Sequence, residues 1–333
     1  MSALTRQIFL PVRDYDLAAT LASGQAFRWQ ARDGGWEGII GPHWVRLQTR
    51  DGGIFAETAA PVADWAWLKN YLQTEADLGA VLKAFPDDEP MHAAVAHCRG
   101  LRLLRQDPWE CLASFILSST KQIVQIQQIV ALLCERFGER VTTPPGRAAA
   151  FTFPDCAALA LRSERELRDC RMGFRAPNLL RAAQMVARRE IDLARLHTLS
   201  VVAARDELVR LPGVGPKIAN CVLLFAGGFQ SAFPVDVWIM KALRELYFPR
   251  RRVGEKRIHQ FAATHFGPHA GYAQQYLFHY MRTKKCPPPE CRLQSAATTQ
   301  ITLLPTEVGV PKGAQVQFRG RCQDLPGGRR GLS

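Results

Sequence analysis

Residues 211–217 read LPGVGPK and decide the fold of this chain. The stretches on either side, 202–210 and 216–225, predict two helices joined by a tight turn. Glycine permits positive φ angles and close backbone approach, which suits Gly213 and Gly215 to that turn. The second helix begins with free N–H groups at the positive end of its dipole. The hairpin therefore predicts a phosphate-binding site.

Two chemically active residues follow the turn. Lys217 lies in the first turn of the second helix and Asp236 lies 19 residues later. A neutral lysine can attack a sugar C1′, form a Schiff base and allow strand scission by β-elimination. A carboxylate nearby can stabilise positive charge at C1′ or orient the amine. The alternatives are a phosphate-contacting Lys217, an Asp236 that only caps a helix, and a hairpin that only anchors DNA.

Composition agrees with a polyanionic partner. The chain has 333 residues, is 47% hydrophobic and carries a net charge of +13. That length predicts two domains, and that charge favours nucleic acid. We see no secretory signal and no apolar run of about 20 residues, and nine scattered cysteines do not suggest a disulfide framework. We expect an intracellular monomer without a membrane partner, located in the cytoplasm or nucleoid of a bacterium or in a eukaryotic nucleus.

The first part of the chain predicts a meander of strands over residues 20–60. Turn signals occur at 33–35, 41–42 and 51–53. Between them, short segments rich in aromatic or β-branched residues predict strands at 26–30, 36–40 and 43–48. A proline- and acid-rich joint at 85–90 marks a domain boundary, so we expect the first domain to cover residues 1–88.

From about residue 90 to residue 285 the sequence predicts helices. Asp107, Pro108 and Glu110 are typical of a helix that begins at Pro108, with Asp107 as its N-cap. Further helices are expected at 178–188, 202–210, 216–225, 237–247 and 273–282. We expect this domain to cover residues 89–285, with the hairpin at 202–225. Residues 286–333 are rich in Gly, Pro, Thr and Arg and predict a flexible basic tail.

Four ordered segments resemble the helix-hairpin-helix DNA glycosylase superfamily, and within it the 8-oxoguanine DNA glycosylases. They are 23–29 (SGQAFRW), 105–112 (RQDPWECL), 172–176 (MGFRA) and 211–217 with Asp236. The resemblance covers roughly residues 5–285. It implies an α+β fold, in which an N-terminal antiparallel β-sheet domain of the TBP-like type precedes an all-α HhH-GPD domain. It also implies a base-excision repair enzyme that excises 8-oxoguanine from double-stranded DNA, with Lys217 as nucleophile and Asp236 as its acidic partner.

The resemblance further implies a pocket for a flipped base. Family members hold the base between a cysteine and a phenylalanine, which correspond to Cys221 and Phe278. The main-chain carbonyl of Gly24 would accept the N7–H of 8-oxoguanine, and Gln274 would read the Watson–Crick edge. The spacing agrees, because Cys221 follows Lys217 by four residues and Phe278 follows Gln274 by four. Without the resemblance, Phe278 is a core residue, Cys221 a small hydrophobe and Gly24 a turn glycine.

The opposite strand is where the chain departs from animal members of the family. Those members carry an asparagine run where this chain has Thr120, and an arginine where it has Gln125. Arg175 is retained and could still bond cytosine. We therefore expect relaxed selectivity for the opposite base. Trp238 also replaces a histidine beside Asp236, which weakens a phosphate contact there.

No cofactor or metal is expected. Related enzymes bind an iron–sulfur cluster through four closely spaced cysteines, whereas Cys286 and Cys291 are followed only by the distant Cys322. Two rival hypotheses remain: a glycosylase for another damaged base, such as an alkylated purine, and a helix-hairpin-helix DNA-binding protein that is not an enzyme. Lys217 argues against the first, because glycosylases for alkylated bases usually lack it.

Overall fold

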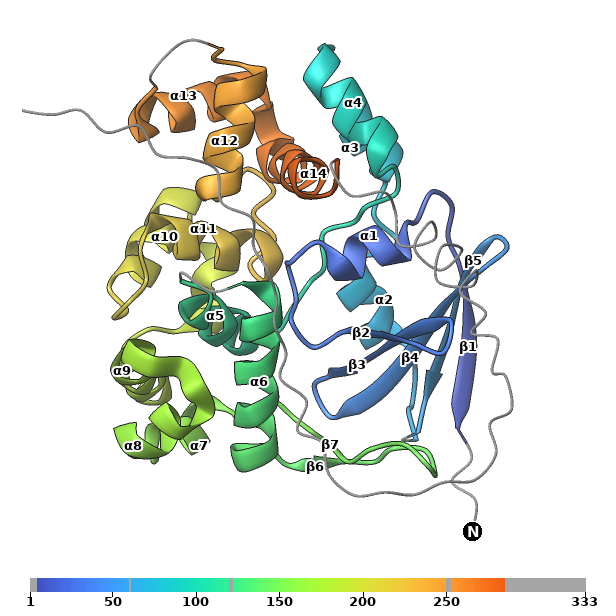
Figure 1. The fold of residues 1–333 in the computed structure, drawn as a ribbon, viewed down its shortest axis with the longest axis vertical. Coiled ribbons are helices and arrows are strands. Elements are labelled where there is room, and N and C mark those ends of the chain that lie inside the picture. Colours follow the sequence, from blue (N-terminus) through green and yellow to red (C-terminus); the bar gives the residue numbers. More distant parts are fainter. Residues whose placement is uncertain (1–4, 60, 120–121, 250–252, 285–333) are drawn as a thin grey trace, which may run out of the picture. The chain divides into compact units, whose positions relative to one another are not determined.

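A five-stranded antiparallel sheet, with strand order β1-β5-β4-β3-β2, is formed by the N-terminal part of the chain (Figure 1). The computed structural model describes residues 5–59, 61–119, 122–249 and 253–284. The strands are β1 (Arg6–Pro11), β2 (Gln30–Arg32), β3 (Gly35–Ile40), β4 (His43–Arg50) and β5 (Gly53–Thr58). Asp33 and Gly34 both have positive φ and join β2 to β3 in a two-residue turn, as the turn signal predicts.

One strand prediction was wrong. Of the segment 26–30 only Gln30 belongs to a strand, because contacts outside the sheet fix the remainder. The carbonyl of Gln25 accepts a hydrogen bond from the side chain of Gln106, and the indole of Trp29 donates to the hydroxyl of Tyr71. The outer strand β1 was not predicted at all.

The helices follow the sheet in the order of the chain. They are α1 (Leu17–Ala22), α2 (Ala66–Leu72), α3 (Leu78–Lys83), α4 (Glu89–His97), α5 (Pro108–Leu117), α6 (Ile123–Phe137), α7 (Cys156–Ala160), α8 (Glu164–Leu167), α9 (Ala176–Ala187), α10 (Val201–Val209), α11 (Pro216–Phe225), α12 (Val237–Leu246), α13 (Glu255–His265) and α14 (Ala270–Thr283). Among the described residues, the helical region also contains β6 (Arg140–Val141) and β7 (Ala150–Phe151), which form a two-residue antiparallel ladder. Asp107 caps α5 as predicted, accepting the Glu110 N–H at 2.8 Å.

Two apolar cores support these layers. In the sheet, Val45, Leu47 and Ile54 pack with Leu68 and Leu72 of α2, so α2 covers one sheet face. In the helical region, α11 is the central element, because every residue from Ile218 to Phe225 is buried. A helix that is apolar all round must lie inside its domain. Only its first turn, with Lys217, approaches the surface.

The predicted hairpin is α10 and α11 with the turn between them. Gly213 has φ +78°, and a Cβ there would lie 2.8 Å from the side-chain nitrogen of Asn178. Both facts require glycine at this position. Gly215 has an ordinary φ of −94° and is the N-cap of α11, where its carbonyl accepts the Ala219 N–H at 3.0 Å.

Gln25, which is fully buried, joins the loop after α1 to the segment that leads into α5. Its side-chain nitrogen donates to the carbonyls of Thr20 and Arg102, and its oxygen accepts the Leu104 N–H at 2.8 Å. Gln275 of α14 donates to the carbonyl of Ser23 at 3.1 Å. The loop that carries Gly24 is thereby attached to both halves.

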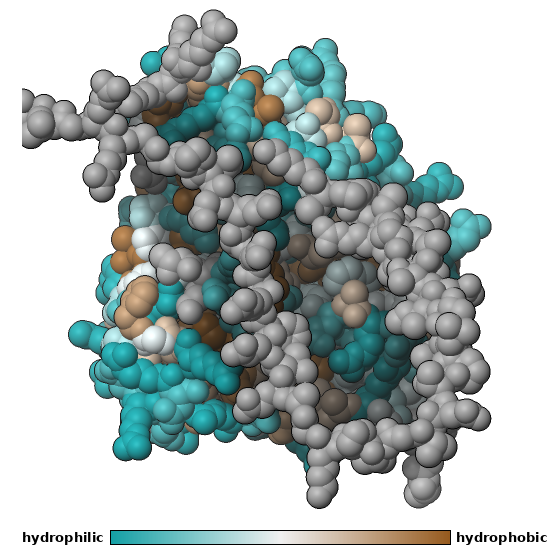
Figure 2. Space-filling model, in the orientation of Figure 1, coloured by the Kyte–Doolittle hydropathy of each residue, from teal (hydrophilic) through white to brown (hydrophobic). Residues whose placement is uncertain are grey.

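The described residues belong to one compact unit that extends to Pro287. The domain boundary at residue 88 therefore stays a prediction, and the predicted tail at 286–333 lies outside the described residues. Among the helices of the described part, none is long and apolar enough to cross a membrane. Hydrophilic residues cover much of the described surface in Figure 2, with apolar residues between them.

Candidate active site

Lys217 is held at the start of α11 above an aromatic cluster. Its Nζ donates to the hydroxyl oxygen of Ser118 at 3.3 Å and lies 5.1 Å from the centre of the Phe115 ring. Phe115 in turn stacks on Phe225 with ring centroids 5.6 Å apart. The amine is half-buried, at the N-terminal end of a helix that offers it a positive dipole. A half-buried amine that is held by a single hydroxyl is suited to act as a nucleophile.

Cys221 lies one turn below Lys217 and is buried. Burial raises the pKa of its thiol to about 11, and the charge of Asp236 adds to that rise, whereas Lys217 opposes it through its charge and a hydrogen bond. Burial also raises the pKa of the neighbouring Cys111 thiol. Both groups are therefore neutral thiols at physiological pH. They form an apolar wall and cannot serve as nucleophiles.

Asp236 is the N-cap of α12, and its Oδ1 accepts the Ile239 N–H at 2.8 Å. Asp236 therefore caps a helix and also acts through its charge, which affects the Cys221 thiol and Arg282. In the described part of the chain no ion pair or hydrogen bond joins Asp236 to Lys217. The carboxylate is close to the reactive region without neutralising the amine.

The predicted base-pocket residues of α14 face the glycine loop. A Cβ on Gly24 would lie 3.6 Å from the Phe278 ring and 2.8 Å from Ile123, and Gly24 has φ +78°. Gln274, one turn before Phe278, is 4% exposed, and within the described residues its Oε1 has no hydrogen-bond partner. A buried amide oxygen without a partner is costly, and a bound ligand would supply one.

The residues predicted to contact the opposite strand differ in their surroundings. Arg175 is only 3% exposed, and its guanidinium lies 4.2 Å from the centre of the Phe174 ring. Gln125 is part of a capping box at the start of α6, where its oxygen accepts the Gln122 N–H at 3.1 Å. Thr120 lies outside the described residues.

Sequence reasoning missed Ser118, Phe174 and Arg282. Ser118 ends α5 and touches Lys217. Phe174 is 62% exposed, a large apolar ring in water that indicates a contact surface. Its place inside the matching segment 172–176 was the available signal. Arg282 follows Phe278 by four residues, the same spacing that relates Phe278 to Gln274, and that signal was not used.

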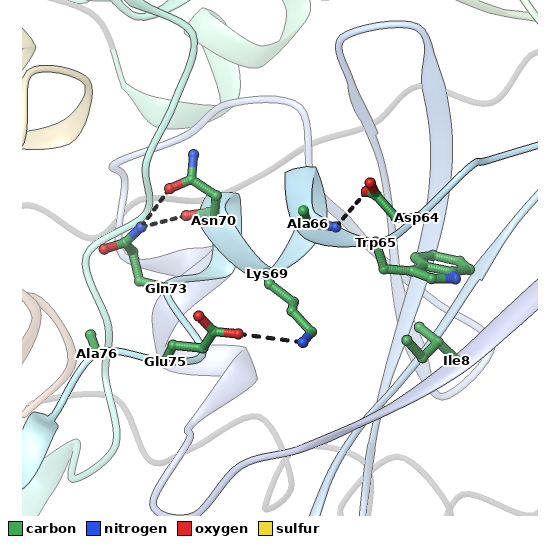
Figure 3. A pocket seen from close by; sticks show the side chains of 9 residues that line it. All are labelled: Ile8, Asp64, Trp65, Ala66, Lys69, Asn70, Gln73, Glu75 and Ala76. Carbon is green, nitrogen blue, oxygen red and sulfur yellow. Dashed lines mark hydrogen bonds and ion pairs between the residues drawn. The ribbon is translucent and has the colours of Figure 1, made fainter.

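Cavities elsewhere offer less chemistry. A cavity of about 710 Å³ lies beside α2, lined by Ile8, Trp65 and Lys69 among others (Figure 3). Its charged groups already have partners, as with Lys69 and Glu75 at 3.3 Å. A cavity of about 590 Å³ borders Asp236 itself. Within the described part, no group of three or more His, Cys, Asp or Glu residues could hold a metal ion, and Cys286, Cys291 and Cys322 lie outside it.

Comparison with known proteins places this geometry in a family. Residues 7–112 match the 8-oxoguanine DNA glycosylase N-terminal domain, and residues 113–266 match the HhH-GPD superfamily of base excision DNA repair proteins. The N-glycosylase/DNA lyase OGG1 of Arabidopsis thaliana is 31% identical over 79% of this chain and 76% of its own length.

Two solved structures share the fold. MBOgg1, in complex with a low-affinity DNA ligand, has 32% identity and a TM-score of 0.80, over 86% of this chain and all of that one. The Clostridium acetobutylicum 8-oxoguanine glycosylase/lyase, bound to double-stranded DNA with cytosine opposite 8-oxoG, has 29% identity and a TM-score of 0.77, over 84% of this chain and 98% of that one. The fold, the site and these likenesses together assign the chain to the 8-oxoguanine DNA glycosylase family of the HhH-GPD superfamily.

Proposed function

We propose that this protein is a base-excision repair enzyme that flips 8-oxoguanine out of duplex DNA, excises it and then cleaves the strand as an AP lyase. The observation that carries this proposal is the setting of Lys217. A half-buried amine at a helix N-terminus faces neutral thiols and an aromatic cluster, with a carboxylate nearby and unpaired with it. A lysine that served only to contact phosphate would have no use for such a setting.

The chemistry follows from the positions of the two residues. The neutral amine of Lys217 attacks C1′, and the bond from C1′ to the base breaks, so that the base leaves with the bonding electrons. Asp236 stabilises the positive charge that grows on the sugar. The aminal then opens to a Schiff base, and loss of a C2′ proton expels the 3′ phosphate by β-elimination. The N-terminal end of α11 and the turn glycines Gly213 and Gly215 would bind a neighbouring phosphate.

Base recognition divides between the sheet loop and α14. Phe278 and Cys221 would stack on the two faces of the base, and Gln274 would supply its unpartnered oxygen to the Watson–Crick edge. The carbonyl of Gly24 would accept N7–H of 8-oxoguanine. Guanine has a bare acceptor at N7, so two acceptors would face each other, at a cost of about 1–3 kcal/mol.

The opposite strand would meet Phe174 and Arg175. The exposed ring is placed to enter the stack where a base has left it, and the guanidinium beside it would bond the opposite base. Thr120 and Gln125 would complete that surface. We further propose that the enzyme acts as a monomer, without a cofactor or membrane partner, in the compartment that holds the genome, and that its domains divide near residue 88 and end near residue 285.

Borohydride trapping tests the proposal. The wild-type protein is incubated with a duplex containing 8-oxoguanine, and the Schiff base is reduced to a stable adduct. We expect a covalent adduct that Lys217→Gln abolishes. Base release without an adduct would favour a glycosylase that lacks lyase activity, and DNA binding without base release would reduce the protein to a hairpin DNA binder.

A further inference from the structure

Arg282 occupies the edge of the proposed base pocket. It lies on α14 one turn after Phe278, and its guanidinium carbon is 5.2 Å from the centre of the Phe278 ring. Its Nη1 would lie 3.4 Å from a Cβ on Gly24. Gln274, Phe278 and Arg282 are spaced four residues apart and therefore lie along one face of α14. That face runs from the buried amide to the glycine loop.

The guanidinium of Arg282 is half-buried and lies beside the Phe278 ring. Burial lowers the pKa of Arg282, and the charge of Asp236 opposes that change. Among the described residues, Arg282 forms no hydrogen bond or ion pair, although it carries five N–H donors. Arginines that are more deeply buried are bonded: Arg28 pairs with Glu110, and Arg102, which is 3% exposed, donates to the carbonyl of Ala76. The N–H donors of Arg282 are therefore available to an acceptor on a bound ligand.

The acceptor follows from the edge of the base that Gly24 would meet. This step rests on the proposed function, in which the Gly24 carbonyl accepts N7–H. In 8-oxoguanine the atom next to N7 is C8, which bears a carbonyl oxygen, O8, where guanine bears a hydrogen. A donor as near to Gly24 as Arg282 reaches the same edge. When the bond to C1′ breaks, the electrons left on N9 delocalise onto O8, so a cation there favours departure of the base.

We propose that Arg282 donates a hydrogen bond to O8 of the flipped base and so reads the atom that defines the lesion. Gly24 and Arg282 then form a complementary pair, an acceptor for N7–H beside a donor for O8. Guanine satisfies neither group, because it has no hydrogen on N7 and no oxygen on C8. The residue contributes to specificity and also stabilises charge on the leaving base.

The test measures binding without turnover. Lys217→Gln serves as the background, and dissociation constants are measured for three duplexes that differ at one position: 8-oxoguanine, guanine, or a tetrahydrofuran abasic analogue. We expect Arg282→Met to lower the preference for 8-oxoguanine over guanine by about 10-fold or more, because charged hydrogen bonds are the stronger ones. Affinity for the abasic duplex should change less than about twofold, since that ligand keeps the phosphates and lacks the base.

Control variants separate the possible outcomes. Arg282→Lys keeps the charge and should retain part of the preference, and it replaces the methionine variant if that one fails to fold. Arg188→Met removes an exposed arginine that pairs only with Glu190 and should change nothing. An unchanged preference in Arg282→Met, or an equal loss on all three duplexes, overturns the proposal, the latter because it identifies a phosphate contact. A background protein that does not prefer 8-oxoguanine to guanine would instead refute the proposed function itself.

Discussion

The hydroxyl of Ser118 lies 3.3 Å from Nζ of Lys217 and accepts its hydrogen bond, while donating its own proton to the carbonyl of Phe115 at 2.7 Å. The carbonyl thus orients the hydroxyl, and the hydroxyl orients the amine. Because the hydroxyl proton is already committed, only an oxygen lone pair faces Lys217. The C-terminal end of α5 therefore orients Nζ of Lys217, the reactive atom at the start of α11.

Ser118→Ala tests that alignment. Losing one such hydrogen bond costs about 0.5–1.5 kcal/mol, so we expect the rate of borohydride trapping to fall about 2- to 12-fold. Affinity for DNA should stay unchanged, because the serine holds the amine and not the phosphate. Ser119→Ala is the matched control, since Ser119 forms no described bond to Lys217. Equal rates in both variants would remove Ser118 from the site.

Asp236→Asn separates the charge from the cap. Asparagine caps helices about as well as aspartate, so the variant should keep α12 and its melting temperature. Without the negative charge, we expect single-turnover excision to fall by at least about 100-fold, as for other electrostatic groups in active sites. DNA binding should persist. Wild-type excision kinetics in this variant would limit Asp236 to its structural role.

The two turn glycines should respond differently to alanine. Gly213→Ala places a side chain at positive φ and 2.8 Å from Asn178, so we expect a loss of about 1–2 kcal/mol of unfolding free energy and weaker DNA binding. For Gly215→Ala, no atom lies within 4 Å of the new Cβ, so we expect a smaller loss of about 0.5–1 kcal/mol, because alanine is a poorer N-cap than glycine. Thermal melts of both variants check this, and equal destabilisation would contradict it.

Opposite-base selectivity should be relaxed. Gln125 is engaged in the cap of α6 where animal members of the family have an arginine. We expect excision of 8-oxoguanine opposite C, A, G and T to proceed at rates within about 10-fold of each other, since one lost bidentate contact accounts for a discrimination of that size. Gln125→Arg should increase the preference for cytosine. A strong cytosine preference in the wild-type protein would show that Arg175 is sufficient for selectivity.

The buried thiols should make the fold sensitive to alkali. Burial raises the pKa of Cys98 to about 12 and those of Cys134 and Cys221 to about 11, from an ordinary value of 9.0. The folded state therefore keeps its thiol protons at pH values where the unfolded chain releases them. The contribution of these buried thiols to the free energy of unfolding is fully present below pH 9. It is lost as the pH rises towards 11 or 12. Urea melts between about pH 8 and about pH 12 check this, and Cys221→Ala should show a shallower decline than the wild-type protein.

Much of the helical site could be predicted from local sequence. The caps at Asp107 and Asp236 and the turn at Gly213 depend on neighbours within four residues, so their pattern is visible in the chain. The resemblance to the family supplied Gly24, which lies in the segment 23–29, and Phe278, which lies outside the four ordered segments. The helix expected at 216–225 is found at Pro216–Phe225, whereas the one expected at 273–282 is found at Ala270–Thr283, with its ends displaced by one to three residues.

What escaped prediction depends on partners that are distant in sequence. The aromatic segment 26–30 was expected to be a strand, yet Trp29 bonds to Tyr71 and does not join the sheet. Ser118 meets Lys217 across 99 residues. The role proposed for Arg282 depends on its position beside Gly24, which is distant in sequence. Such contacts are set by how helices and sheet pack, and no periodicity in a single segment reports them.

The attachment of Gln25 to both halves has an evolutionary consequence. The reacting residues Lys217 and Asp236 come from the helical part, whereas base recognition is shared between α14 and Gly24, which lies in the loop that Gln25 anchors. Mutations in that loop can therefore change which damaged base is accepted while the strand-cleaving chemistry is inherited intact. Gln25 is the residue on which this arrangement depends. Its loss would free the loop that carries Gly24, while Lys217 and Asp236 would keep their positions.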